Sequence, residues 1–197
     1  MTDRSRRDLR VLAVIGPSGA GKSTAVRALA AAGRVDVTPS WTTRPPRPGE
    51  VGRCVEHRFV TDGEFDELER RGFFVATCPM FGLPHRYGLP AVGEPRAGAV
   101  PLVMLRAPHV AVVRQHHERV AVYQVEDGRE RVAARLLDRH RDPAELGTRL
   151  RDYDAEIALG RAAADRVFVN GGEPADLVAA IWEAIAADFG APAPVRP

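Results

Sequence analysis

The residues with the clearest chemical purpose lie near the start of the chain, in the stretch GPSGAGKST from Gly16 to Thr24. It satisfies the phosphate-binding pattern G-x-x-x-x-G-K-[ST] through Gly16, Gly21, Lys22 and Ser23. Glycines let backbone N–H groups turn toward phosphate oxygens, and the start of the following helix adds a partial positive charge. In such a loop the lysine contacts the β and γ phosphates and the hydroxyl binds Mg²⁺. The stretch therefore predicts a nucleotide-phosphate site with Ser23 as metal ligand.

The segments around this loop have the structure that the motif requires. Val11–Ile15 is a continuous apolar run of strand length, typical of a strand buried on both faces. From Lys22, the sequence KSTAVRALAAAG predicts a helix that ends at Gly33. A glycine-rich turn that merely caps a helix is the alternative, and the strand before the loop argues against it. The residues expected to contact the nucleotide are Gly16, Ser18, Gly19, Ala20, Gly21, Lys22, Ser23 and Thr24.

The composition is that of an ordinary globular domain. The 197 residues fit one domain, and 45% hydrophobic with 27% charged residues argues against disorder. A net charge of +2 and 6% aromatic residues indicate neither a basic patch nor a stacking platform, so we expect no nucleic-acid partner. Lys22 is the sole lysine in the chain, and the phosphate loop explains it because that position requires a compact ammonium group.

The cysteines and the first residues bear on the cellular setting. Cys54 and Cys78 lack metal-ligand spacing and are too few for a disulfide framework, which indicates a reducing, cytoplasmic setting. The charged start MTDRSRRDLR precedes only a short apolar run, so we expect neither a signal peptide nor a membrane span. The sequence says nothing about the oligomeric state.

The rest of the chain predicts a doubly wound α/β fold around a parallel sheet. Residues 40–90 are rich in Pro, Gly and Arg, and we expect an inserted lobe of loops around one helix at 63–72. Beyond it strands and helices alternate, as in a parallel sheet flanked by helices. The expected strands are 100–105, 119–126 and 165–170, and the expected helices are 106–118, 128–142, 144–162 and 173–189.

Two arginines in the stretch SWTTRPPRPGEVG, residues 40–52, form a second candidate site. Arg44 and Arg47 carry planar guanidinium groups suited to a bidentate grip on a dianionic phosphate monoester. The alternative is that both are solvated loop charges.

The pattern S-x-T-T-R-x-P-R-x-G-E in this stretch resembles the phosphate-binding segment of guanylate kinases. The resemblance extends along nearly the whole chain, through HRFV before an acidic helix, the pair Tyr87-Gly88, the helix ARLLDR, Arg149 with Glu156, and RVFVN. It implies a P-loop NTPase-type sheet and the use of ATP and Mg²⁺. It also implies a single domain, 1–197, with a core at about 8–39, 97–130 and 155–190, an acceptor-binding lobe at about 40–96 and a helical lid at about 131–154.

The same resemblance assigns roles to individual residues. Arg44 and Arg47 match the arginines that grip the acceptor's phosphate with help from the tyrosine at Tyr87, and His57 takes the place of a second tyrosine. A histidine there would donate a hydrogen bond with some dependence on pH. The expected substrate-binding residues are Ser40, Arg44, Arg47, Glu50, His57 and Tyr87.

The lid arginines complete the expected catalytic set. Arg135 and Arg139 share one helical face and, with Arg149, match the family's lid arginines. Phosphoryl transfer depends on charge stabilisation at the equatorial oxygens, so Lys22 and these arginines are the expected catalytic groups. Arg131, Arg141 and Arg151 fit a solvated basic face. Asn170 matches an asparagine near the adenine, although asparagine is also a common turn residue.

The resemblance fails where guanylate kinases read guanine. Their base-reading glutamate, the Ser or Thr after the Tyr-Gly pair, and the acidic residues of the third strand are replaced here by Ala76, Leu89 and Val103 with Leu105. Sites built on hydrogen bonds to a substrate discriminate by roughly 10⁴ to 10⁵, so guanine should be read poorly by the usual route. The chain resembles ribose 1,5-bisphosphate phosphokinases in these departures.

The sequence thus predicts an ATP-dependent kinase that moves the γ-phosphoryl group to the phosphate of a small molecule. GMP is the default acceptor, and ribose 1,5-bisphosphate or another small phosphorylated metabolite is the alternative. A third interpretation is a non-catalytic module that binds phosphopeptides, as in scaffold proteins. Such modules typically lose the P-loop lysine and the lid arginines, which this chain keeps.

Overall fold

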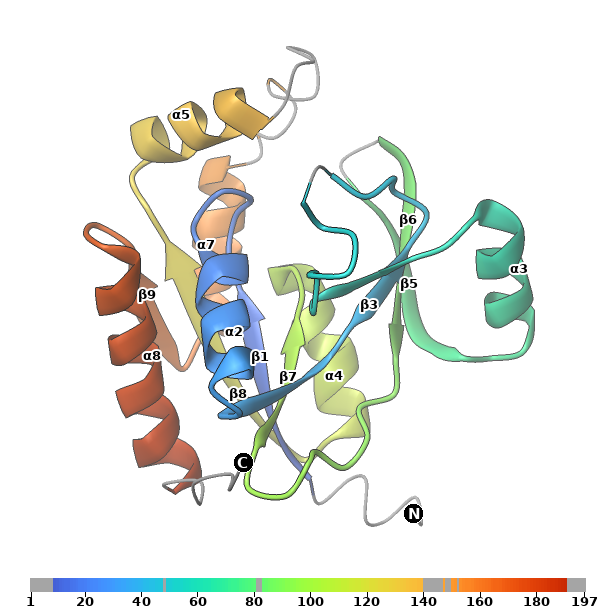
Figure 1. Ribbon diagram of the computed structural model, residues 1–197, viewed down its shortest axis with the longest axis horizontal. Coiled ribbons are helices and arrows are strands. Elements are labelled where there is room, and N and C mark those ends of the chain that lie inside the picture. The colour runs from blue at the N-terminus through green and yellow to red at the C-terminus, as the bar shows by residue number, and fades with distance from the viewer. Residues whose placement is uncertain are drawn as a thin grey trace.

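The computed structural model describes residues 9–47, 49–80, 83–139, 147, 150–151 and 153–190, without the side chains of residues 79, 80, 83 and 139. Within them, a parallel sheet has the strand order β2-β7-β1-β8-β9 (Figure 1). The expected α/β fold with a parallel sheet flanked by helices is confirmed. The strands are β1 (Arg10–Ile15), β2 (Val35–Thr38), β7 (Val100–Met104), β8 (Arg119–Glu126) and β9 (Arg166–Val169).

Helices cover both faces of this sheet. Leu12 and Val14 of β1 pack in one apolar cluster with α2 (Lys22–Ala31) and α8 (Pro174–Phe189). Val11, Ala13 and Ile15 of β1 point to the opposite face, into a second apolar cluster with α4 (Val110–His116) and the end of α7 (Tyr153–Ala163). The run VLAVI is apolar at every position because the strand is buried on both sides.

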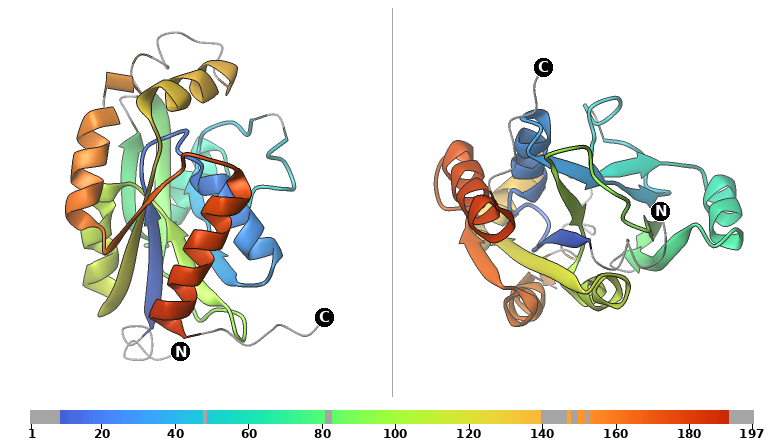
Figure 2. Two further views of the ribbon diagram at one scale, coloured as in Figure 1. Left: turned by 90° about the vertical axis from the view of Figure 1, so that its left-hand side faces the viewer. Right: turned by 90° about the horizontal axis from the view of Figure 1, so that it is seen from below.

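The segment between β2 and β7 forms a second sheet to one side of the core (Figures 1 and 2). Its order is β4-β3-β6-β5, and α3 (Asp62–Arg70) lies beside it. A Thr61–Glu64 capping box starts α3. The strands are β3 (Ser40–Thr42), β4 (His57–Phe59), β5 (Phe74–Met80) and β6 (Leu83–Pro90).

The prediction of loops around one helix in this segment was therefore wrong in part. The helix exists, but four strands were missed, because β3 and β4 are too short for a pattern and β5 and β6 contain prolines and a glycine. β3 also pairs with β6, more than forty residues away in the chain, a pairing that no local window reveals. Strand β2, at the edge beside β7, was missed as well.

The remaining elements lead into the candidate site. The short helix η1 (Ala107–His109) links β7 to α4, and α5 (Arg129–Arg139) follows β8. Of the expected lid, residues 140–146, 148, 149 and 152 lie outside the described residues. None of the helices in the described part of the chain has the length and apolar character needed to cross a bilayer.

Candidate active site

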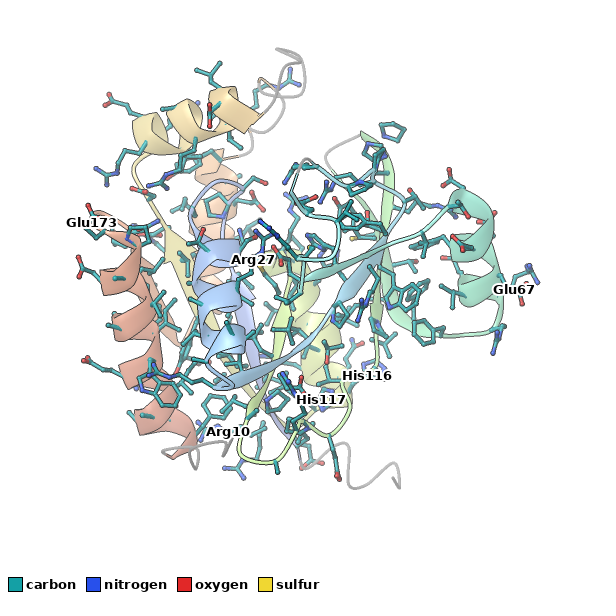
Figure 3. All side chains as sticks on the ribbon, viewed as in Figure 1. Arg10, Arg27, Glu67, His116, His117 and Glu173 are labelled. Atoms are coloured by element: carbon teal, nitrogen blue, oxygen red, sulfur yellow. The ribbon has the colours of Figure 1, made fainter. Side chains whose placement is uncertain are left out.

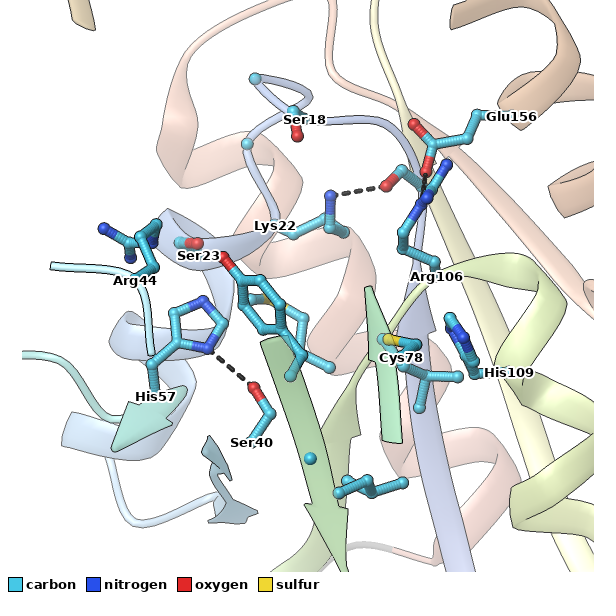
Figure 4. Close-up of a pocket in the computed structure, with 18 of the residues that line it drawn as sticks. Ser18, Lys22, Ser23, Ser40, Arg44, His57, Cys78, Arg106, His109 and Glu156 are labelled. Atoms are coloured by element: carbon cyan, nitrogen blue, oxygen red, sulfur yellow. Dashed lines mark hydrogen bonds and ion pairs between the residues drawn. The ribbon is translucent and has the colours of Figure 1, made fainter. Parts of the chain in front are cut away.

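A cavity of about 170 Å³ lies where the glycine loop, the second sheet and the end of β7 meet (Figure 4). It brings together segments that are far apart in the sequence. From the glycine loop it is lined by Gly16, Ser18, Gly19, Gly21, Lys22, Ser23 and Thr24, and from the second sheet by Ser40, Arg44, Arg47, His57, Ala76, Cys78, Tyr87, Gly88 and Leu89. Met104, Leu105, Arg106, His109, Leu136 and Glu156 complete the lining.

The glycine loop has the shape of a phosphate cradle. Gly16 and Gly21 have φ values of 133° and 104°, which side chains rarely allow, and a Cβ on Gly16 would lie 2.0 Å from the Val125 carbonyl oxygen. The Lys22 ammonium donates to the Gly16 and Pro17 carbonyl oxygens, at 2.7 Å each. These bonds fold the lysine back over the loop and hold its charge at the cavity.

Asn170, the residue directly after β9, makes a hydrogen bond to the glycine loop. Its side-chain amide donates to the Ala20 carbonyl oxygen at 2.9 Å, and Ala20 itself is fully buried rather than part of the cavity wall. A Cβ on Gly21 would lie 2.4 Å from that amide nitrogen. Asn170 also lines a second cavity of about 180 Å³, together with Thr24 and Arg135.

Arg44 is buried beside a carboxylate. It is 6% exposed, and its guanidinium lies 3.0 Å from Glu50. The Arg47 backbone N–H donates to the same carboxylate at 2.7 Å. Burial acts to raise the pKa of Glu50, but the hydrogen bonds from Arg44 and Arg47 outweigh it and lower the pKa. Glu50 does not line the cavity, so it orients both arginines instead of facing a ligand.

His57 and Tyr87 stand next to these arginines. The two rings meet edge to face with centroids 5.8 Å apart, and His57 Nδ1 lies 2.8 Å from the Ser40 hydroxyl oxygen. Burial, followed by the charge of Arg44, lowers the pKa of His57 to about 4. The imidazole is therefore neutral near neutral pH and serves as a hydrogen-bonding group.

A buried carboxylate joins the second sheet to the phosphate loop. Glu56 is 2% exposed and accepts two hydrogen bonds from Arg27 of α2, at 3.0 and 2.6 Å. Burial acts to raise the pKa of Glu56, but the hydrogen bonds and the positive charge of Arg27 outweigh it and lower the pKa. Figure 3 shows Arg27 on α2, on the side toward the second sheet. Sequence reasoning missed this link because its partners are far apart in the chain.

The expected catalytic arginines are placed in part. Arg135 donates to the Gly19 carbonyl oxygen at 3.0 Å and pairs with Asp127 at 2.7 Å, so α5 is tied to the phosphate loop. It lines the second cavity and not the first. Arg131 pairs with Asp127 too, at 2.6 Å, with its side chain half exposed, as expected for a solvated face. The Arg139 side chain and Arg149 lie outside the described residues.

The positions that depart from the guanylate kinase pattern form an apolar wall. Ala76 and Leu89 are direct partners across β5 and β6, and both line the cavity. Leu105 lines it from the end of β7, whereas Val103 is fully buried in the sheet and does not reach it. This wall offers no side-chain acceptor for the N–H groups of a base.

Arg106 is a candidate functional residue that motif reasoning did not single out, and its partner is Glu156. Arg106 Nε donates to Glu156 at 2.8 Å, and Glu156, on α7, is 5% exposed. Arg106 comes two residues after β7, and the carboxyl ends of parallel strands are where α/β sheets bind ligands. That rule would have found it. Among the described residues, no group of three or more His, Cys, Asp or Glu is placed to hold a metal ion.

Comparison with known proteins identifies the family. The chain is 33% identical over 153 residues to a guanylate kinase of Nitrosococcus oceani. The aligned region covers 77% of this chain and 70% of that protein. It is also 33% identical over 192 residues to a guanylate kinase of Bifidobacterium longum, over 92% of this chain and 95% of that one. The chain belongs to the guanylate kinase family. It is therefore a phosphotransferase of the nucleotide-kinase type.

A solved structure supports the fold of this guanylate kinase family member. The crystal structure of guanylate kinase from Anaplasma phagocytophilum matches with a TM-score of 0.62 at 20% identity, over 92% of this chain and 87% of that one. No family model matches the chain.

Proposed function

We propose that this family member transfers the γ-phosphoryl group of ATP to the phosphate of a small phosphate monoester. The observation that carries the proposal is that Lys22, at the start of α2, and Arg44, in the loop after β3, line one cavity. An oxygen of the acceptor phosphate bonds to the γ phosphorus while the bond to the bridging oxygen breaks, and ADP leaves with that electron pair. Two anionic reactants held in one cationic cavity meet the need for positioning and charge stabilisation.

ATP would occupy the glycine loop and the second cavity. The loop amides and Lys22 suit its phosphates, and the cavity beside Asn170 and Arg135 suits the nucleoside. Mg²⁺ fits this donor set because it keeps several waters and binds phosphate oxygens with few protein ligands. Ser23 would supply the hydroxyl, and the ion would neutralise charge on the phosphates.

The acceptor's phosphate would bind at Arg44 and Arg47, with Ser40, His57 and Tyr87 around it. Glu50 holds both arginines by charge-assisted bonds, which reduces the entropy lost when they grip a phosphate. In this proposal residues 40–96 form the acceptor lobe. The lid at about 131–154 would bring Arg139 and Arg149 over the γ phosphate, with Arg135 beside the donor.

GMP is the default acceptor, since the relatives are named guanylate kinases. A second candidate, ribose 1,5-bisphosphate or a similar small phosphorylated metabolite, is favoured by the apolar wall of Ala76, Leu89 and Leu105. That wall removes the hydrogen-bond acceptors that distinguish guanine from other groups.

The test is an assay of ADP release with ATP and Mg²⁺ against GMP, dGMP, AMP, UMP and ribose 1,5-bisphosphate. Lys22→Ala should abolish turnover with every acceptor, whereas Arg44→Ala should raise the acceptor KM with little change in the KM for ATP. Thermal stabilisation by ATP should disappear in Lys22→Ala but not in Arg44→Ala. Wild-type protein that neither turns over any acceptor nor binds ATP would refute the proposal.

A further inference from the structure

A buried ion pair joins the two sides of the cavity. Arg27 lies on α2, the helix that begins with Lys22 (Figure 3), and Glu56 directly precedes β4 of the second sheet. The Glu56 carboxylate accepts one hydrogen bond from Arg27 Nε at 3.0 Å and another from the end of the guanidinium at 2.6 Å. Because a guanidinium is planar and rigid, two such bonds fix the direction as well as the distance between the helix and the strand.

The backbone of Glu56 holds groups on the acceptor side of the cavity. Its carbonyl oxygen accepts hydrogen bonds from the Ser40 N–H at 3.1 Å and from the Ser40 hydroxyl at 3.3 Å. The next residue, His57, has its Nδ1 atom 2.8 Å from the same hydroxyl oxygen. Ser40 and His57 line the cavity, whereas Arg27 and Glu56 line neither this cavity nor the second one. Glu56 therefore contacts α2 with its side chain and the cavity wall with its backbone.

Burial makes the contact between Arg27 and Glu56 hard to replace. The Glu56 side chain is 1% exposed and that of Arg27 is 39% exposed. A buried carboxylate that loses its partner is left with an uncompensated charge, so the folded chain favours the arrangement in which Arg27 stays in place. The pairs of Arg86 on β6 with Asp62 and Asp66 differ from this one, because they join the second sheet only to its own helix α3.

The approach of the two phosphates depends on this arrangement. In the proposed function Lys22 and Ser23 hold the donor, and both precede Arg27 on the same helix. The acceptor phosphate lies at Ser40 and its neighbours. Reacting atoms must come within roughly 3–3.5 Å of each other, and a misplacement of about 1 Å can lower the rate by about 100-fold. The position of β3 and β4 relative to α2 therefore controls the rate of transfer.

We infer that Arg27 and Glu56 are positioning residues that set the distance between the acceptor phosphate and the γ phosphate of the donor. They act on the transfer step and not on the affinity for ATP, since both lie outside the cavities. This inference rests on the proposed phosphotransferase function and deepens it.

The test uses the single variants Arg27→Gln and Glu56→Gln, which remove opposite charges. An electrostatic effect on the anionic reactants would change the rate in opposite directions, whereas lost positioning lowers it in both variants. Single-turnover transfer from ATP and Mg²⁺, to whichever of GMP and ribose 1,5-bisphosphate the wild type uses, should slow by about 10- to 100-fold in each. The Kd for ATP, measured by calorimetry, should stay within about 3-fold of the wild-type value.

The controls separate positioning from a general loss of structure. Asp66→Asn breaks an arginine–carboxylate pair within the second sheet and α3, and it should transfer at the wild-type rate. The double variant Arg27→Gln/Glu56→Gln should lose no more than about 3-fold beyond one single variant, because both changes remove the same contact. Opposite effects of the two single variants, additive losses, equal slowing in Asp66→Asn, or a loss of ATP affinity as large as the loss of rate would overturn the inference.

Spin labels give a readout that needs no turnover. Labels at Arg70→Cys on α3 and Glu183→Cys on α8, both exposed positions, report the distance between the second sheet's helix and the core, with the two native cysteines replaced by serine. The distribution of distances should be at least about 2-fold broader in Arg27→Gln and Glu56→Gln than with the pair intact. If no acceptor gives ADP, the proposed function fails by itself, and equal distributions then contradict the inference.

Discussion

Two glycines inside helices should respond in opposite directions to the same substitution. Gly160 in α7 faces Gln124 of β8, and a Cβ at that position would lie 1.5 Å from the Gln124 side-chain oxygen. Gly63 in α3 has nothing within 4 Å of its Cβ position. Alanine improves helix propensity at both sites by up to about 1 kcal/mol. The steric conflict is present at Gly160 and absent at Gly63.

The cost at Gly160 follows from what the Gln124 amide does. The residue is fully buried, and its nitrogen donates to Glu126 at 3.0 Å and to the Ile157 carbonyl oxygen at 3.1 Å. Moving the amide out of the way breaks these bonds, at about 1 kcal/mol for the neutral one and about 1.5–3 kcal/mol for the one to a carboxylate. After a gain in propensity of about 1 kcal/mol, Gly160→Ala should destabilise the protein by about 1.5–3 kcal/mol.

Thermal unfolding followed by circular dichroism tests this. For a chain of this size about 1 kcal/mol shifts Tm by roughly 2–4 °C, so Gly160→Ala should lower Tm by about 3–12 °C. Gly63→Ala should leave Tm unchanged or raise it by up to about 4 °C. In a Gln124→Ala background, Gly160→Ala should cost almost nothing because the methyl group has room. Equal shifts in Gly160→Ala and Gly63→Ala, or an equal cost in both backgrounds, would refute the reasoning.

Two further predictions concern buried ionisable groups. Glu56→Gln should lower the free energy of unfolding by about 1–3 kcal/mol, because Glu56 is buried; the loss is limited because Arg27 is 39% exposed and can be rehydrated. Glu67→Gln is the control, since Glu67 forms an exposed pair with Arg70 on α3 (Figure 3), and it should change this free energy by less than about 0.5 kcal/mol. Equal Tm values in the two variants would contradict this prediction. His57 has a folded-state pKa of about 4, below its ordinary 6.5, so the unfolded chain takes up the proton first and stability is lost as the pH falls from about 6.5 toward 4. Between about pH 7 and about pH 5, urea unfolding should show a loss of about 2 kcal/mol in the stability of the wild type that is absent in His57→Gln. The same pH dependence in both proteins would argue against a neutral, half-buried imidazole.

The sequence by itself determined the elements whose signals are local. The apolar run of β1, the glycine loop and the start of α2 follow from side-chain types and spacing within about twenty residues, and the structure contains them where the sequence predicts. β8 has the predicted bounds, Arg119–Glu126, because eight residues of high strand propensity end at turn residues. The capping box of α3 is also a local signal.

Only the tertiary structure decided what lies opposite the phosphate loop. The second sheet forms through pairing between distant short strands, and it brings Ala76 and Leu89 side by side as a wall. The pairs Arg27–Glu56 and Arg106–Glu156 join residues 29 and 50 positions apart. A single sequence contains no trace of such contacts, because their free energy comes from burial and charge pairing that exist only after the chain has folded. The phosphate loop could thus be predicted from its spacing, while the chemistry of the acceptor wall depended on which side chains the fold placed together.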